Sequence, residues 1–167
     1  GNSRAKDATV PSNYDVVLTT YGVLAHDFSV MLKEAEEARL REAEPPRLTA
    51  AFAVLWRRVI LDEAHYIKGR TTQSAQAVFQ LKAECRWAVT GTPIQNHLDD
   101  LFSLLKFLQL VPFDEYAYWV RQVLRPLMEH KDPRAMDKLH AALRPILLRR
   151  TKDTRLPSGE PILQLPP

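Results

Sequence analysis

Two adjacent carboxylates, Asp62 and Glu63, follow an apolar run at residues 59–61 and precede Ala64 and His65. The run has no polar face, so it predicts a strand that is buried on both faces of a parallel sheet. Ligands of open α/β sheets bind at the carboxyl ends of strands, and two acids buried there need a cation or a proton donor. In nucleotide hydrolases one strand-end acid holds Mg²⁺, and its neighbour orients or deprotonates the attacking water. The pair therefore indicates metal-assisted hydrolysis.

The same acids have a simpler interpretation as the start of a helix. Asp62 would then be an N-cap, Glu63 a first-turn acid and His65 a surface residue. A motif this short leaves both interpretations open, so the choice between them depends on the neighbouring elements.

The neighbouring elements predict a βαβ unit. Residues 71–84 show helical spacing behind an N-cap at Thr71 or Thr72, and residues 86–90 form a second apolar strand. A helix between two such strands makes a right-handed crossover, which leaves the strands parallel. The second strand continues into TGTPIQN at residues 90–96, so both polar strand ends face one edge of the sheet and a common cleft. This convergence favours a functional site over a helix cap.

The other segments also alternate between strand and helix patterns. Residues 14–24 predict a strand, buried at residues 16–18, that ends at Thr19, Thr20 and Tyr21. Residues 156–167 are rich in proline and predict an extended linker. Helices are expected at residues 28–44, 98–110, 113–130 and 133–150.

The composition excludes several classes of protein. With 46% hydrophobic and 26% charged residues, the 167-residue chain is typical of soluble globular proteins. The single cysteine, Cys85, excludes a disulfide framework and a multi-cysteine zinc module, and we expect it to be a small buried side chain in an intracellular protein. No stretch has the pattern of a transmembrane helix or a signal peptide, so no membrane partner is expected. The first residue is Gly1 rather than methionine, which suggests a piece of a longer protein.

Positive charge is concentrated in residues 121–152. This stretch holds nine Lys and Arg against three acids, a local charge of +6 in a chain of net charge +3. A basic stretch on an otherwise mildly acidic chain is typical of a protein that binds a polyanion. The alternative is a solvated helical face, because charge runs are common on exposed helices.

Four ordered segments resemble the Swi/Snf-type chromatin-remodelling and DNA-repair ATPases of helicase superfamily two. They are DVVLTTYGVL at residues 15–24, VILDEAHYIK at 59–68, AVTGTPIQNHLDDLFSLLKFL at 88–108 and LLRRTK at 147–152. The ending from residue 147 onward resembles the subgroup of helicase-like transcription factor and the RING-containing postreplication-repair translocases. The resemblance implies an α/β fold: a three-layer RecA-like parallel sheet, present as a partial lobe, with a C-terminal helical appendage.

The resemblance also implies a division of the chain. Residues 1–112 would form the C-terminal part of the first RecA-like lobe, which is the ATP-binding lobe. Residues 113–152 would form a basic helical protrusion, and residues 153–167 a linker towards a second lobe outside this sequence.

The resemblance assigns catalytic roles to three residues. Asp62 would coordinate the Mg²⁺ of bound ATP, and Glu63 would position or activate the hydrolytic water. His65 would connect both acids to a loop that couples hydrolysis to the closure of two RecA-like lobes. The coupling residues would be Thr90, Gly91, Thr92 and Gln95.

Nucleic-acid contacts are implied at two places. The segment with Thr20 and Tyr21 would lie near the DNA backbone. Arg149, Arg150 and Lys152 would contact phosphates or brace the two lobes against each other.

The resemblance therefore implies part of an ATP-dependent, nuclear double-stranded DNA translocase that acts on nucleosomes or in DNA repair. None of the five glycines is followed by lysine, so the sequence holds no phosphate-binding P-loop, and we expect the 167 residues alone to be inactive as an ATPase. Two alternatives stay open: a non-catalytic DNA-binding or scaffolding fragment, and a fragment of a DEAH-type RNA helicase.

Overall fold

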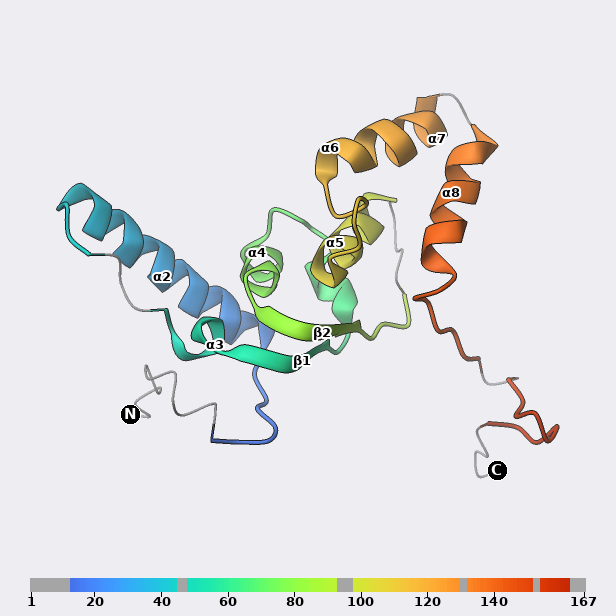
Figure 1. Cartoon of the computed structure of the whole chain (residues 1–167), viewed down its shortest axis with the longest axis horizontal. Helices are drawn as coiled ribbons and strands as arrows, with labels where there is room; N and C mark the ends of the chain where they lie inside the picture. The colour runs from blue at the N-terminus through green and yellow to red at the C-terminus, as the bar shows by residue number, and fades with distance from the viewer. Residues whose placement is uncertain (1–12, 45–47, 93–97, 130–131, 152–153, 163–167) are drawn as a thin grey trace. The chain divides into compact units, whose positions relative to one another are not determined.

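The computed structural model describes residues 13–44, 48–92, 98–129, 132–151 and 154–162 (Figure 1). The chain divides into two compact units, Gly1–Leu124 and Arg125–Pro167. No helix in the described segments is long and apolar enough to cross a membrane.

The first unit contains a parallel βαβ crossover. Strand β1 (Leu55–Leu61) pairs with strand β2 (Lys82–Ala88), and helix α4 (Gln73–Phe79) connects them. The side chain of Thr72 caps α4 by accepting the N–H of Ala75, as the sequence predicts. The helix ends before residue 84 because the residues from Lys82 onward pair with β1. The α/β fold with a parallel sheet is thus confirmed.

Helices pack against one side of this sheet. Helices α4 and α5 (Asp99–Leu108) lie on the same side of the two strands in Figure 1. The short helices are α3 (Ala50–Ala53), the 3-10 turn η1 (Ala64–Ile67) and α6 (Tyr116–Trp119), which continues into a π-helical turn η2 (Val120–Leu124). The largest fully buried side chains come from α3, η1, α4, α5, α6 and η2: Phe52, Ile67, Val78, Phe102, Leu105, Phe107, Trp119 and Val123.

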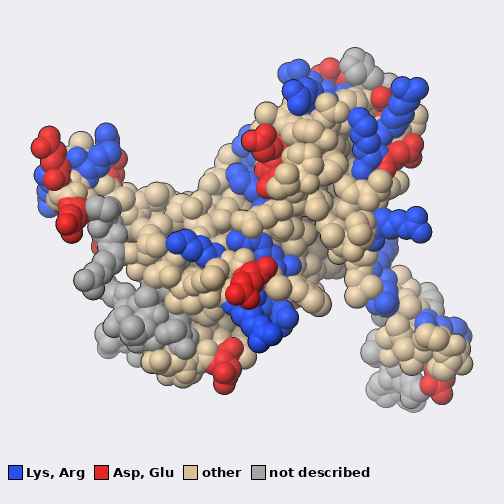
Figure 2. Space-filling view, viewed as in Figure 1, with Lys and Arg blue, Asp and Glu red and all other residues tan. Residues whose placement is uncertain are grey.

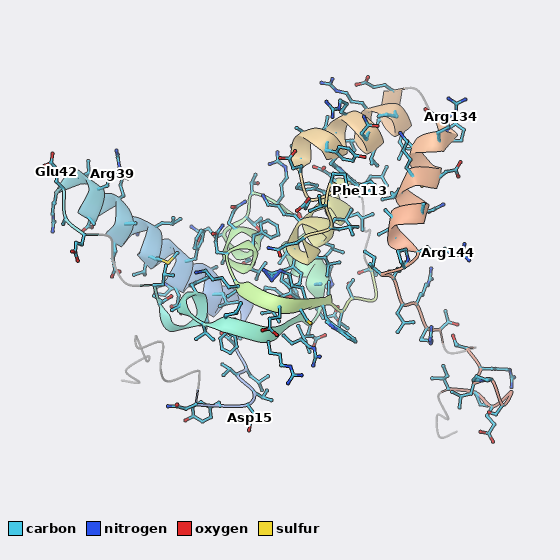
Figure 3. The ribbon with its side chains drawn as sticks, viewed as in Figure 1. Asp15, Arg39, Glu42, Phe113, Arg134 and Arg144 are labelled. Atoms are coloured by element: carbon cyan, nitrogen blue, oxygen red, sulfur yellow. The ribbon has the colours of Figure 1, made fainter. Side chains whose placement is uncertain are left out.

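Helix α2 (Tyr21–Leu40) begins where the sequence predicts the end of a strand. The side chain of Thr20 caps it by accepting the N–H of Val23, and its first half buries Leu24 and Phe28. The second half extends away from the sheet, with Arg39 and Glu42 near its far end (Figures 1 and 3). The predicted buried strand at residues 16–18 is wrong: Leu18 is 92% exposed, because in the described chain no neighbouring strand pairs with this segment.

Strand β1 is not buried on both faces, so the prediction of a fully buried strand at residues 59–61 is wrong. Ile60 is 57% exposed and its register partner Trp87 is 55% exposed. Because both side chains of this pair are more than half exposed, this part of the sheet face is open to solvent. Cys85 is also exposed, contrary to the prediction that it is a small buried side chain.

The second unit contains two helices and a turn. Helix α7 (Arg125–Glu129) packs against α8 (Pro133–Leu143), and α8 buries Leu139. The Asp132 side chain caps α8 by accepting the N–H of Arg134. Residues 155–161 form a turn rather than the predicted extended chain, with Gly159 at φ 88°, a left-handed conformation that glycine adopts without strain.

Candidate active site

The ends of the two parallel strands are joined by backbone hydrogen bonds. The N–H of Val89 donates to the carbonyl of Leu61, and the N–H of Ala64 donates to the carbonyl of Val89, each at 2.8 Å. Asp62 and Glu63 lie between the two bonded positions on the β1 side, and Thr90 follows Val89. The predicted convergence of the two strand ends on one edge of the sheet is confirmed.

Glu63 has an unusual backbone conformation. Its φ of 46° and ψ of 50° are left-handed, which costs a residue other than glycine about 1 kcal/mol. The turn is held on its far side by Ala64 and Ile67 of η1, both completely buried. Strained residues of this kind cluster at functional sites, where the surrounding structure enforces them. The local structure is a strained turn and not the simple helix cap that the sequence left open.

Both carboxylates reach solvent. Asp62 and Glu63 are exposed, so the expectation of two buried acids is wrong for this chain, and no cation is needed to offset their burial. One oxygen of Asp62, Oδ1, accepts the N–H of Glu63 at 2.9 Å. The carboxylates are therefore available at the sheet edge for a ligand that approaches from solvent.

His65 lies beside Glu63. Its Nδ1 is 3.1 Å from Oε2 of Glu63, which is an ion-pair distance, but the two atoms lack the alignment of a hydrogen bond. Within the described segments this buried nitrogen has no hydrogen-bond partner. The imidazole ring stacks on Tyr66, with ring centroids 4.8 Å apart and planes tilted by 23°. His65 is therefore held next to the acid with one polar atom still available.

Tyr21 reaches the site from the first turn of α2. Its hydroxyl donates to the carbonyl of Asp62 at 2.8 Å, and its ring lies 5.7 Å from the ring of Tyr66. Burial, and after it the negative charges of Asp62 and Glu63, raise the pKa of Tyr21 to about 12. The hydroxyl thus stays protonated and remains a donor across the physiological pH range.

The coupling residues are described only in part. Thr90, Gly91 and Thr92 form a short turn in which the N–H of Thr92 donates to the Thr90 hydroxyl at 3.2 Å. A Cβ built at Gly91 meets nothing within 4 Å, so space alone does not require glycine there. Gln95 lies outside the described residues.

Further contacts hold the chain that follows the turn with Asp62 and Glu63. The buried hydroxyl of Ser103 donates to the carbonyl of Lys68 at 2.9 Å. Arg70 lies over the ring of Tyr116, 3.8 Å from its centroid. These contacts connect α5 and α6 to the chain that follows the acidic turn, which is the turn that carries Asp62 and Glu63.

The start of α5, which follows the coupling residues in the sequence, is also held by a contact with α6. Asp99 opens α5, and its Oδ1 accepts the indole N–H of Trp119 at 3.2 Å. Trp119 is itself fully buried, so this bond lies at the edge of the core. Helix α6 therefore contacts the chain after the first loop through Tyr116 and the start of α5 through Trp119.

The implied nucleic-acid residues lie in both units. Thr20 and Tyr21 belong to the first unit, where one caps α2 and the other contacts Asp62. Arg149 and Arg150 are exposed in the second unit, and Lys152 lies outside the described residues. Figure 2 shows Lys and Arg side chains spread along the second unit, and Figure 3 places Arg134 and Arg144 near opposite ends of α8.

Several contacts of the site have no signature in the sequence. Tyr21 and Asp62 are 41 residues apart. Ser103 and Lys68 are separated by 35 residues, and Ser103 sits among the buried apolar residues of α5. The only sequence signal for this bond is that Ser103 is a polar residue at a core position of a predicted helix, where a buried hydroxyl needs a partner.

The donor set suits one side of a Mg²⁺–nucleotide complex. Mg²⁺ in such sites typically takes one or two carboxylates, with phosphate oxygens and water completing its shell. Asp62 offers a carboxylate at the open sheet edge. Among the described residues no group of three or more His, Cys, Asp or Glu side chains forms a metal site, so the ion would depend on the nucleotide for its other ligands.

Comparison with known proteins supports a single family. The SNF2-related domain matches residues 1–162. The chain is 43% identical over 167 residues to DNA repair protein RAD5B of Arabidopsis thaliana, covering 100% of this chain and 12% of that protein. It is 39% identical over 166 residues to helicase-like transcription factor of Mus musculus, covering 99% of this chain and 15% of that protein. The chain thus spans less than a sixth of the length of either curated relative.

A solved structure gives the same result at the level of the fold. The Sulfolobus solfataricus SWI2/SNF2 ATPase core in complex with dsDNA superposes with a TM-score of 0.63 at 34% identity, covering 84% of this chain and 25% of that one. The parallel sheet and its helices therefore match part of a RecA-like SWI2/SNF2 ATPase core. With its sequence match over nearly all its residues and this agreement in fold, the chain belongs to the SNF2-related domain family.

Proposed function

We propose that this chain forms part of the first RecA-like lobe of an ATP-dependent double-stranded DNA translocase that acts in DNA repair or chromatin remodelling in the nucleus. The named relatives are a DNA repair protein and a helicase-like transcription factor, and the solved neighbour is an ATPase core bound to dsDNA. Mg²⁺ and ATP would be the cofactors, and a second lobe and a P-loop would come from outside these 167 residues.

The observation that carries this proposal is the hydrogen-bonded junction of the two strand ends. Because Ala64 and Leu61 both bond to Val89, the acids between them keep a fixed position relative to Thr90. A change at the nucleotide could therefore be transmitted to the coupling loop without a long path. Glu63 would act as the base or orient the attacking water, and His65 would transmit its state to Thr90, Gly91, Thr92 and Gln95.

Asp62 would coordinate the Mg²⁺ that accompanies the bound ATP. Mg²⁺ supplies electrostatic stabilisation of the charge that develops on the transferred phosphoryl group. The backbone of Asp62 is fixed by the bond from Tyr21, and its Oδ1 is fixed by the N–H of Glu63. The carboxylate is therefore oriented before any ligand arrives, which favours tight positioning.

The second unit would contribute contacts to DNA phosphates. Its exposed Arg149 and Arg150 belong to the stretch with local charge +6. A translocase steps along any sequence, so its contacts go to phosphates rather than to base edges. Thr20 and Tyr21, the other residues implied in DNA contact, already make hydrogen bonds within the first unit, and a contact with DNA would have to be compatible with these bonds.

The test is DNA-stimulated ATP hydrolysis by the full-length protein with Glu63 changed to Gln. Glutamine keeps the shape of the side chain but cannot accept a proton, so we expect normal ATP binding and a loss of turnover of about 100-fold or more. Glu34→Gln, an exposed residue of α2, is the matched control and should keep full turnover. Normal hydrolysis by Glu63→Gln would remove Glu63 from the mechanism and favour a non-catalytic DNA-binding role.

A further inference from the structure

We propose that Tyr21 is a positioning residue, which holds Glu63 in its left-handed conformation through the Asp62 carbonyl and through its ring contact with Tyr66, which in turn stacks on His65. The inference rests on the proposed function, because it assumes that Glu63 acts in hydrolysis. It gives Tyr21 a task inside the site, in place of a contact with the DNA backbone.

The first support is that both polar groups of one peptide unit are hydrogen-bonded. The carbonyl of Asp62 and the N–H of Glu63 belong to the same planar peptide group. Tyr21 donates to that carbonyl at 2.8 Å, and Oδ1 of Asp62 accepts that N–H at 2.9 Å. A peptide plane held at both ends cannot rotate freely, and its orientation sets the φ angle of Glu63. The bond from Tyr21 therefore opposes relaxation of Glu63 out of the left-handed region.

The second support is a chain of ring contacts. The ring of Tyr21 lies 5.7 Å from that of Tyr66, and the ring of Tyr66 lies 4.8 Å from the imidazole of His65. Aromatic pairs at these separations are attractive beyond the burial of their surface. His65 in turn has its Nδ1 3.1 Å from the Glu63 carboxylate. Tyr21 thus reaches Glu63 by two routes, one through the backbone and one through side chains.

The hydroxyl of Tyr21 has one hydrogen to donate. In the structure that hydrogen is used by the Asp62 carbonyl. A phosphate contact from the same hydroxyl would require this bond to break. The two roles therefore compete, and they predict opposite outcomes when the hydroxyl alone is removed.

The experiment uses the full-length protein with Tyr21→Phe, Tyr66→Leu and the double variant. Kd for duplex DNA, KM for ATP and kcat at saturating DNA are measured for each. Loss of one positioning hydrogen bond should lower kcat by about 3- to 10-fold in Tyr21→Phe, with KM and Kd within about twofold of the wild type. Hydrogen exchange at the Glu63 and Ala64 amides should become faster in the same variant. Tyr14→Phe, an exposed tyrosine, is the control and should change nothing.

The double variant separates a shared pathway from two independent effects. If the hydroxyl of Tyr21 and the ring of Tyr66 both act on Glu63, Tyr66→Leu should lower kcat less in the Tyr21→Phe background than in the wild type. An unchanged kcat with weaker DNA binding in Tyr21→Phe would overturn the inference and return Tyr21 to the DNA interface. Loss of turnover in Glu63→Gln combined with wild-type kcat and amide exchange in Tyr21→Phe would overturn this inference alone. Turnover in Glu63→Gln would instead overturn the proposed function.

Discussion

The strand-end site and the basic second unit are built in different ways. At the site, residues from β1, β2 and α2 are fixed by hydrogen bonds between segments far apart in the sequence. In the second unit, Arg149 and Arg150 are exposed, and the hydrogen bond of Arg150 goes to the neighbouring carbonyl of Arg149. The comparison leads us to expect that fixed geometry determines what the site does and that charge determines what the basic unit does. Changes at the site should therefore lower turnover with little dependence on salt, and changes in the basic unit should be graded and salt-dependent.

The largest effect should come from the core residue that supports the site. Trp119 is fully buried, and its indole N–H binds Asp99. Trp119→Ala should destabilise the protein by about 3–5 kcal/mol, through lost burial and a cavity. Trp87→Ala is the matched control, because Trp87 is more than half exposed, and it should cost less than about 1 kcal/mol. Urea unfolding gives both values, and equal losses would contradict the assignment of Trp119 to the core.

The next largest effect tests the bond under the acidic turn. Ser103→Ala leaves the carbonyl of Lys68 without its buried donor, which should cost about 1–3 kcal/mol. Ser29 makes the same kind of bond, to the carbonyl of His26, but on an exposed face of α2, so Ser29→Ala should cost no more than about 0.5 kcal/mol. Thermal unfolding of the two variants is the measurement. A Ser29 effect as large as that of Ser103 would show that burial of the bond is unimportant.

A graded effect is expected in the basic unit. If Arg149 and Arg150 bind phosphates of duplex DNA, each lost contact reduces the slope of log K against log salt by about 0.9. The full-length protein with both changed to Ala should bind every DNA sequence more weakly and with a shallower slope. An Arg39→Ala variant, on the far part of α2, serves as control. An unchanged slope together with lost ATPase would mean that the two arginines brace the lobes instead.

The smallest effect concerns the protonation of Tyr21. Its pKa is raised to about 12, so folding favours its protonated form. This contribution to stability is fully present below the unfolded-state pKa of 10.0 and is lost as the pH rises towards 12. At a pH of about 11, ultraviolet titration of the folded protein should show Tyr21 still protonated. That tyrosine should be missing from the titration of Tyr21→Phe. Both proteins should therefore contain the same number of ionised tyrosines at this pH, and one more ionised tyrosine in the wild type would contradict the shift.

The sequence predicted the parts of the fold that depend on local pattern. Helix α4, with its cap at Thr72, and the parallel strands around it follow from spacing, as does the meeting of both strand ends at one edge. The prediction failed where burial depends on what lies across the sheet. The apolar pattern of Ile60 is the same whether or not its face is covered, so the sequence alone could not show that this face is open.

The candidate site also has features that the sequence predicted and features that it did not. The acids Asp62 and Glu63 stand together in the sequence, so their pairing could be predicted. The left-handed conformation of Glu63 could not, because that region favours glycine and nothing in the local sequence demands it. The bond from Tyr21 depends on how α2 packs, which local patterns do not encode. The same is true of the apolar residues 16–18, which resemble a buried strand and lead instead into the cap of α2.

The most direct test of the central claim is the structure of the full-length protein with Mg²⁺ and a non-hydrolysable ATP analogue. The account predicts that Mg²⁺ is held by Asp62, directly or through a water, and that the γ-phosphate lies beside Glu63 at the junction with Val89 and Thr90. A nucleotide bound at another edge of the sheet, or a metal that neither acid approaches, would contradict it.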